Sequence, residues 1–161
     1  MGRKASVDAL QAALRAEHAA VYGYGVVGAR LRGSLRDSAR TMWHTHRTQR
    51  DDLTARLTGL AAEPAAAAAA YRLPLQVTSA RTAAQVAAAL EDDLVTAYTG
   101  LAGSPDVALR VLAARAMQEA MTRAVRWHSL AGRPEMPGSP RSAAFPGLPP
   151  GALVPKPRPG D

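Results

Sequence analysis

Residues 9–31, ALQAALRAEHAAVYGYGVVGARL, decide the fold of this chain, because they read as one long amphipathic helix with a carboxylate on its apolar face. The residues that share this face recur at spacings of three and four: Leu10, Leu14, Glu17, Val21, Tyr24, Gly28 and Leu31. A carboxylate on a buried face needs a partner that holds it or a ligand that it holds. Each glycine in a helix interior costs about 1 kcal/mol relative to alanine, so we expect another helix to approach closely at Gly23, Gly25 and Gly28.

Three further helices are predicted by the same periodicity. The second runs over residues 35–60, the third begins at a Ser79 or Thr82 cap and reaches residue 101, and the fourth covers residues 106–131. For the first helix we expect Ser6 as the N-cap, and for the fourth we expect Ser104 as the cap with Pro105 in the first turn. The chain is therefore expected to be all-α.

The connections between the helices predict their topology. The first and third connections are short turns, whereas residues 61–78 form a connection long enough to travel the length of a bundle. Within it, residues 65–71 could form a short helix. Short, long and short connections give an up-down-down-up four-helix bundle with one crossover between the second and third helices.

The C-terminal region differs in composition from the helical part. From residue 134 the chain is rich in proline and glycine and has no periodicity. We therefore divide the chain into a bundle, residues 1–133, and a tail, residues 134–161. The single phenylalanine of the chain, Phe145, lies in this tail, and we expect residues 145–148 to dock on the bundle while the end stays mobile.

Composition excludes several classes of protein. The chain has no cysteine, which excludes disulfides and thiolate metal sites and fits a cytoplasmic location. No signal-peptide pattern and no run of about 18 apolar residues is present, so neither secretion nor a membrane partner is expected. The net charge of +7 comes mostly from arginines scattered over helix faces, which is weaker support for nucleic-acid binding than a concentrated basic patch.

Antiparallel pairing of the first two helices predicts a buried polar cluster. Residue i of the first helix then faces roughly residue 67 minus i of the second. Glu17 is thus expected beside Arg50 and Gln49, with His46 about one turn away. In the third helix, Glu91 is central and lies beside the apolar face. In the fourth, Glu119 is central but lines up with polar residues.

Motifs along nearly the whole chain resemble a known family. They are AEHAAVYGYGVVGARL, HRTQRDDL, AAAAAYRLPLQVT, LEDDLVTAY and AFPGLP. They are similar to those of an actinobacterial ferritin-like family of unknown function, and the bundle topology with a carboxylate halfway along three helices resembles the wider ferritin-like superfamily. The resemblance covers about residues 7–150 and is uninformative about activity.

The resemblance implies a metal site that this sequence only partly retains. Di-iron members of the superfamily use one Glu from each of two helices and a Glu-x-x-His motif from each of the other two. Matching positions gives Glu17 and Glu91 as the two single ligands. The second helix has His46-x-x-Gln49 and the fourth has Glu119-x-x-Thr122, so neither Glu-x-x-His motif is complete.

Three hypotheses for the function follow. The favoured one is a non-catalytic interaction or scaffolding domain with a degenerate metal site, binding a second copy of itself as a homodimer or another protein. In it, Glu17, His46, Gln49 and Arg50 form a buried polar cluster without cofactor. The alternative is an iron- or manganese-binding oxidoreductase or iron-handling protein, whose atypical centre has four candidate ligands: Glu17, His46, Glu91 and Glu119. The third is a basic module that binds nucleic acid through the arginines of the second helix: Arg36, Arg40, Arg47 and Arg50.

Overall fold

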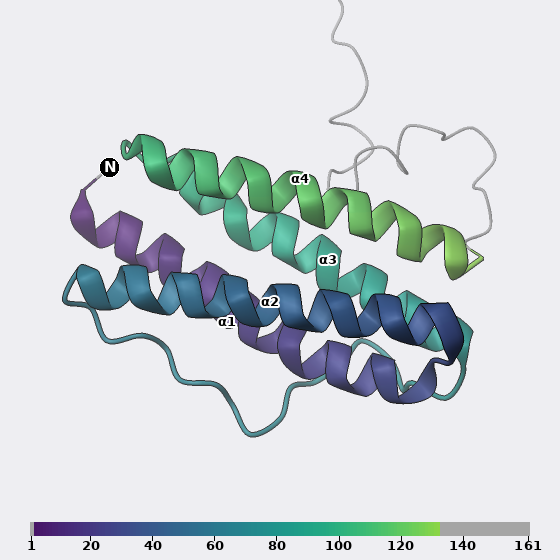
Figure 1. Cartoon of the computed structure of the whole chain (residues 1–161). Helices are drawn as coiled ribbons and strands as arrows, with labels where there is room; N and C mark the ends of the chain where they lie inside the picture. Colours follow the sequence, from purple (N-terminus) through teal and green to yellow (C-terminus); the bar gives the residue numbers. More distant parts are fainter. Residues whose placement is uncertain (1, 133–161) are drawn as a thin grey trace, which may run out of the picture.

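The computed structural model describes residues 2–132, and these residues form four long helices joined in the predicted order. The helices are α1 (Arg3–Arg30), α2 (Gly33–Gly59), α3 (Ala80–Ala102) and α4 (Val107–Leu130). Figure 1 shows α1 and α2 running in opposite directions, and the long connection then returns along the bundle so that α3 runs parallel to α2. The up-down-down-up topology and the all-α class are confirmed.

The helix ends differ in detail from the sequence prediction. Helix α1 begins at Arg3 with Gly2 as its N-cap, so the predicted cap at Ser6 is wrong, and that residue lies inside the helix. Asp106, and not Ser104, caps α4 by accepting a hydrogen bond from the backbone N–H of Ala108. The prediction for α3 is confirmed, because Ser79 and Thr82 form a reciprocal capping box.

The crossover between α2 and α3 is extended over most of its length. The short helix suggested for residues 65–71 is not formed. Side chains of α1 hold this segment in place through hydrogen bonds to its backbone. Gln11 accepts a hydrogen bond from the backbone N–H of Ala65 at 2.9 Å, and His18 Nε2 lies 3.0 Å from the carbonyl oxygen of the same residue.

Only one of the three glycines in α1 meets the expected close approach. A Cβ atom at Gly23 would overlap Leu90 Cδ1 of α3, so the glycine lets the two helices pack tightly. A Cβ at Gly28 would make an ordinary contact of 3.9 Å with Ala39. At Gly25 nothing lies within 4 Å, so the prediction is wrong for that residue.

The helices do not contact one another evenly. Helix α1 packs against α2 and α3, and α4 packs against α3, but α2 and α4 bring no Cα atoms within 8 Å of each other. Side chains reach across the space between α2 and α4, where Arg126 of α4 donates a hydrogen bond to Ser38 of α2 at 3.0 Å. Among the described residues the core consists of two apolar clusters, one including Leu14, Leu53 and Tyr98 and the other including Tyr24 and Trp127. A buried polar layer lies between them.

Candidate functional site

Glu17 and His46 form the centre of the buried polar layer. Glu17 lies midway along α1 and His46 midway along α2, and both are fully buried. His46 Nδ1 lies 2.8 Å from Glu17 Oε2, which is the distance of a charge-assisted hydrogen bond. The predicted convergence of these two side chains is present in the structure.

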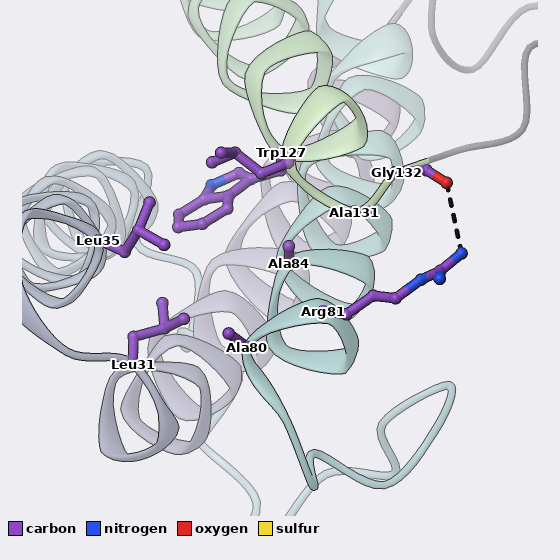
Figure 2. A pocket seen from close by; sticks show the side chains of 9 residues that line it. Leu31, Leu35, Ala80, Arg81, Ala84, Trp127, Ala131 and Gly132 are labelled. Carbon is purple, nitrogen blue, oxygen red and sulfur yellow. Dashed lines mark hydrogen bonds between the residues drawn. The ribbon is translucent and has the colours of Figure 1, made fainter.

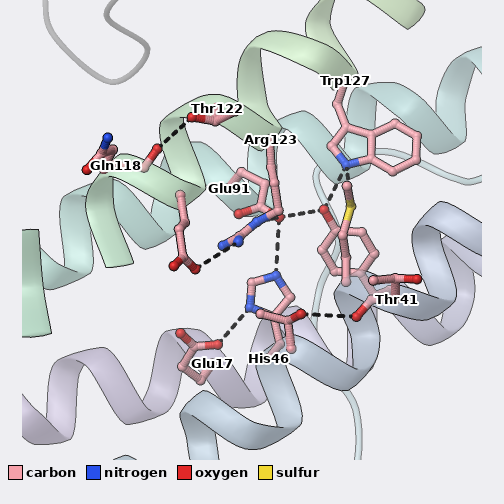
Figure 3. Close-up of polar contacts among 12 residues, drawn as sticks. Glu17, Thr41, His46, Glu91, Gln118, Thr122, Arg123 and Trp127 are labelled. Atoms are coloured by element: carbon pink, nitrogen blue, oxygen red, sulfur yellow. Dashed lines mark hydrogen bonds and ion pairs between the residues drawn. The ribbon is translucent and has the colours of Figure 1, made fainter. Parts of the chain in front are cut away.

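Glu91 of α3 occupies the opposite side of the His46 ring. Its Oε1 atom lies 3.2 Å from His46 Nε2, and its side chain is also fully buried. Figure 3 shows the imidazole between the two carboxylates, with one ring nitrogen directed to each. Helix α3 buries a carboxylate here because it lies between α1 and α4, so an unusually wide part of its surface is covered.

Arg123 and three aromatic side chains complete the network around the carboxylates. Arg123 of α4 donates from Nε to Glu91 Oε1 at 2.9 Å and is itself mostly buried. Tyr98 donates to Glu17 Oε1 at 2.7 Å, and Tyr24 donates to Glu91 Oε1 at 2.6 Å. The Trp127 indole N–H in turn lies 2.8 Å from the Tyr24 hydroxyl and donates to it.

These contacts make a continuous hydrogen-bonded chain across the bundle. It runs from the Trp127 indole through Tyr24 to Glu91, crosses the His46 ring to Glu17, and ends at Tyr98. The Tyr24 ring also stacks on the imidazole, with centroids 5.1 Å apart. The network therefore joins the two apolar clusters of the core and fixes the orientation of the His46 ring.

Electrostatics favour the protonated form of His46. Burial lowers the pKa of this imidazole, but the hydrogen bonds and negative charges of Glu17 and Glu91 outweigh burial and raise the pKa from 6.5 to about 9. The ring is thus an imidazolium at neutral pH and donates from both nitrogens. Two carboxylates, one imidazolium and the Arg123 guanidinium sum to zero charge, which is how these ionised groups can remain buried together.

The pKa values of the neighbouring groups fit the same arrangement. Burial, followed by the charge of Glu91, raises the pKa of Tyr24, and burial with the charge of Glu17 raises that of Tyr98. Both phenols therefore keep their protons and act as donors. Burial lowers the pKa of Arg123, but the charge of Glu91 outweighs that effect and raises it.

The donor set does not fit the di-metal centre that the fold family implies. A metal ligand histidine needs a neutral ring with a free nitrogen lone pair, whereas both ring nitrogens of His46 already contact carboxylate oxygens. The Arg123 guanidinium, 2.9 Å from Glu91, adds a second positive charge where a cation would bind. Within residues 2–132, no group of three or more acidic, histidine or cysteine side chains is arranged to hold a metal ion.

Three of the predicted site residues lie outside this network. The guanidinium of Arg50 pairs with Asp51 at 2.7 Å near the surface, so its predicted pairing with Glu17 is wrong. The antiparallel register placed Arg50 at the right depth but not on the buried face. Gln49 makes no hydrogen bond to Glu17, and its Oε1 atom is buried without a partner. The Glu119 side chain is 55% exposed and reaches only Arg123, at 3.5 Å, so it does not join Glu17 and Glu91.

The prediction also used the wrong pair of positions in α4. The residues that face the buried layer are Ala120, which is buried, and Arg123, three residues further on. Ala120 and Arg123, and not Glu119 and Thr122, are therefore the two α4 residues at this spacing that face the buried layer. Sequence reasoning missed Arg123 because it flanks the apolar face, and only its long side chain brings the charge inward.

The arginines considered for nucleic-acid binding have mixed surroundings on α2. Arg47 lies over the ring of Trp43, with 4.5 Å between its guanidinium carbon and the ring centroid, and Arg50 pairs with Asp51. Arg36 and Arg40 are exposed. Nucleic-acid binding stays a prediction.

Solved structures define the class of protein to which this fold belongs. The chain is similar to a ferritin-like, diiron-carboxylate protein from Bacillus anthracis, with 16% identity and a TM-score of 0.68 over 81% of this chain and 99% of that one. At this identity the likeness shows the fold alone. The protein is a ferritin-like four-helix bundle.

The family is shown by a match over most of the chain. Residues 9–150 match the model of a domain of unknown function, DUF4439, and the chain belongs to that family. It is also similar to a conserved hypothetical protein, rv2844, from Mycobacterium tuberculosis. The two share 34% identity over 81% of this chain and 99% of that one, with a TM-score of 0.77. No curated protein matches the chain. None of the helices in the described part is long and apolar enough to span a membrane.

Proposed function

We propose that this protein is a non-catalytic ferritin-like domain in which a protonated histidine takes the place of the metal ions. One observation carries the proposal, namely that the His46 ring lies between Glu17 and Glu91 with a nitrogen directed to each carboxylate. In di-iron members of the fold, cations hold the carboxylates of facing helices together. Here the imidazolium and the Arg123 guanidinium supply the positive charge.

The network has the properties of a structural element. A buried charge network is stable only when each charge has a partner of opposite sign and hydrogen-bonding groups around it. Glu17 and Glu91 each have a cationic partner and a tyrosine donor. The network therefore aligns α1, α2, α3 and α4 with one another and leaves function to the surface of the bundle.

The surface role that we propose is protein binding, either to a second copy or to another protein in the cytoplasm. Two large apolar side chains are exposed on the first turns of α4, Val107 at 61% and Val111 at 45%. Val111 also borders a cavity of about 300 Å³ between α2 and α4, where the two helices are far apart. Light scattering of the full chain tests self-association. A monomer at all concentrations would leave only a different protein as the partner.

Metal loading of the purified full chain tests the proposal as a whole. After incubation with Fe(II) or Mn(II) and removal of unbound ions, we expect far less than one metal ion per chain. Stoichiometric metal that disappears in Glu17→Gln but remains in Glu119→Gln would establish the metal-binding alternative. One observation supports that alternative. Glu91 Oε2 is buried and has no hydrogen-bonding partner, so this carboxylate oxygen could accept a metal ion.

A restored motif provides the matching gain-of-function test. The changes His46→Glu, Gln49→His, Ala120→Glu and Arg123→His rebuild a Glu-x-x-His on both α2 and α4 in the positions that face the core. We expect this variant to bind divalent metal and to be stabilised by it, whereas wild-type protein shows no thermal shift with the same ions. Circular dichroism reports whether the variant is folded before metal is added.

A further inference from the structure

A cavity of about 190 Å³ opens at the end of the bundle where α1 turns into α2 and α4 ends. Figure 2 shows Leu31 and Leu35 on one side of it, Ala84 of α3 at its base and the Trp127 ring above. Its lining is mostly apolar. At its border Leu130 is 44% exposed, whereas most leucines in residues 2–132 are buried.

The chain itself leads into this cavity. Ala131 and Gly132, the last described residues, are part of the lining, so the polypeptide leaves α4 at the border of the cavity. Gly132 has a positive φ of 60°, which turns the chain sharply. The Arg81 side chain donates to the Gly132 carbonyl oxygen at 3.3 Å and holds this exit in place.

The residues that follow belong to the same domain. The family match extends to residue 150, which is 18 residues beyond the last residue that the structure describes. This stretch contains Phe145 and Leu148, two large apolar side chains separated by Pro146 and Gly147. Twelve residues lie between Gly132 and Phe145, and this length of chain can span about 40 Å. A segment tethered beside a cavity also binds there with a small entropic cost of loop closure.

We propose that Phe145 and Leu148 of this chain dock in the cavity beside Trp127. The Phe145 ring covers the partly exposed Leu35 at the mouth of the cavity, over the buried indole of Trp127, and removes apolar surface from water. Leu148 covers Leu130 at the border.

Engineered disulfides test this placement directly, because the chain contains no cysteine of its own. The test variant carries Leu130→Cys and Gly147→Cys in the full chain. The matched control carries Ser129→Cys and Gly147→Cys, with the same tether length within one residue, but Ser129 is exposed and does not line the cavity. Under mild oxidation at low concentration, we expect the intramolecular disulfide in the test variant to form at least ten times faster than in the control.

Equal rates in the two variants would overturn the proposal, because the tether alone would then account for the disulfide. Disulfide-linked dimers of the test variant at low concentration would show instead that a second copy occupies the cavity. As a second measurement, Phe145→Ala in the full chain should lower Tm by about 6 °C or more and, in a Trp43→Phe background that leaves Trp127 as the single tryptophan, change the fluorescence. Leu153→Ala, outside the family match, should leave both unchanged. If Phe145→Ala also changes neither, the docking is refuted.

Discussion

Raising the pH removes the proton that binds Glu17 and Glu91 together through His46. The pKa of His46 is about 9 in the folded protein and about 6.5 in an unfolded chain. Because the folded value is higher, the stabilisation is fully present below about pH 6.5 and is lost as the pH rises through 9. A difference of about 2.5 pH units corresponds to about 3 kcal/mol of unfolding free energy.

Denaturant unfolding of the full chain at several pH values between 6 and 9.5 measures this loss. We expect the free energy of unfolding to fall by about 3 kcal/mol over this range, with the steepest change above pH 7. His44→Gln should give the same curve, because His44 is exposed and lies outside the network. Glu17→Gln removes one of the two carboxylates that raise the pKa of His46, so its stability should begin to fall at a lower pH. A flat curve for the wild-type protein, or one that rises with pH, would refute the imidazolium bridge.

Three further predictions concern single residues of the core. Arg123→Met keeps an unbranched, flexible stem but leaves a buried carboxylate without its guanidinium partner, and it should cost about 3 to 5 kcal/mol in chemical denaturation. Tyr98→Phe removes one donor to a buried carboxylate oxygen and should cost about 1 to 3 kcal/mol in the same assay. Gly23→Ala should be less stable than Gly25→Ala by about 1 to 3 kcal/mol, because only the first new Cβ meets Leu90.

Controls for these variants come from the same helices. Arg126→Met changes an exposed arginine one turn away from the network and should cost less than about 1 kcal/mol. If it costs as much as Arg123→Met, the effect does not come from the buried pair. Tyr22→Phe, at a tyrosine that packs beside Tyr71 outside the network, should be nearly neutral. Equal stabilities of the two glycine variants would contradict the close packing of α1 on α3.

The architecture could be predicted from the sequence because it depends on periodicity and on connection lengths. Each helix carries a repeat of apolar residues at spacings of three and four, and residues 61–78 are too many for a turn between adjacent antiparallel helices. The meeting of Glu17 and His46 followed from the antiparallel pairing of two helices joined by a short turn. Helix ends were less certain, as Ser6 shows, because several residues near an end can act as caps.

The rest of the site could not be predicted because it depends on contacts between elements distant in the sequence. Glu91 lies well off the apolar axis of α3, and it is buried only because two neighbouring helices cover that helix. Arg123 starts from the flank of α4 and reaches the carboxylate through a flexible side chain. Arg50 was expected inside from its register, but it lies off the buried face of α2 and pairs with Asp51 near the surface. Angular position on a helix does not determine where a long charged side chain ends.

The protonation state of His46 tests the central claim most directly. In ¹⁵N NMR spectra of the full chain at pH 7, we expect both ring nitrogens of His46 to be protonated, each coupled to its own hydrogen, and the spectrum to stay unchanged when Zn(II) is added in equal amount. The three other histidines provide internal references in the same spectrum. A neutral His46 ring, or a shift of one ring nitrogen to a metal-bound value at one ion per chain, would contradict the account.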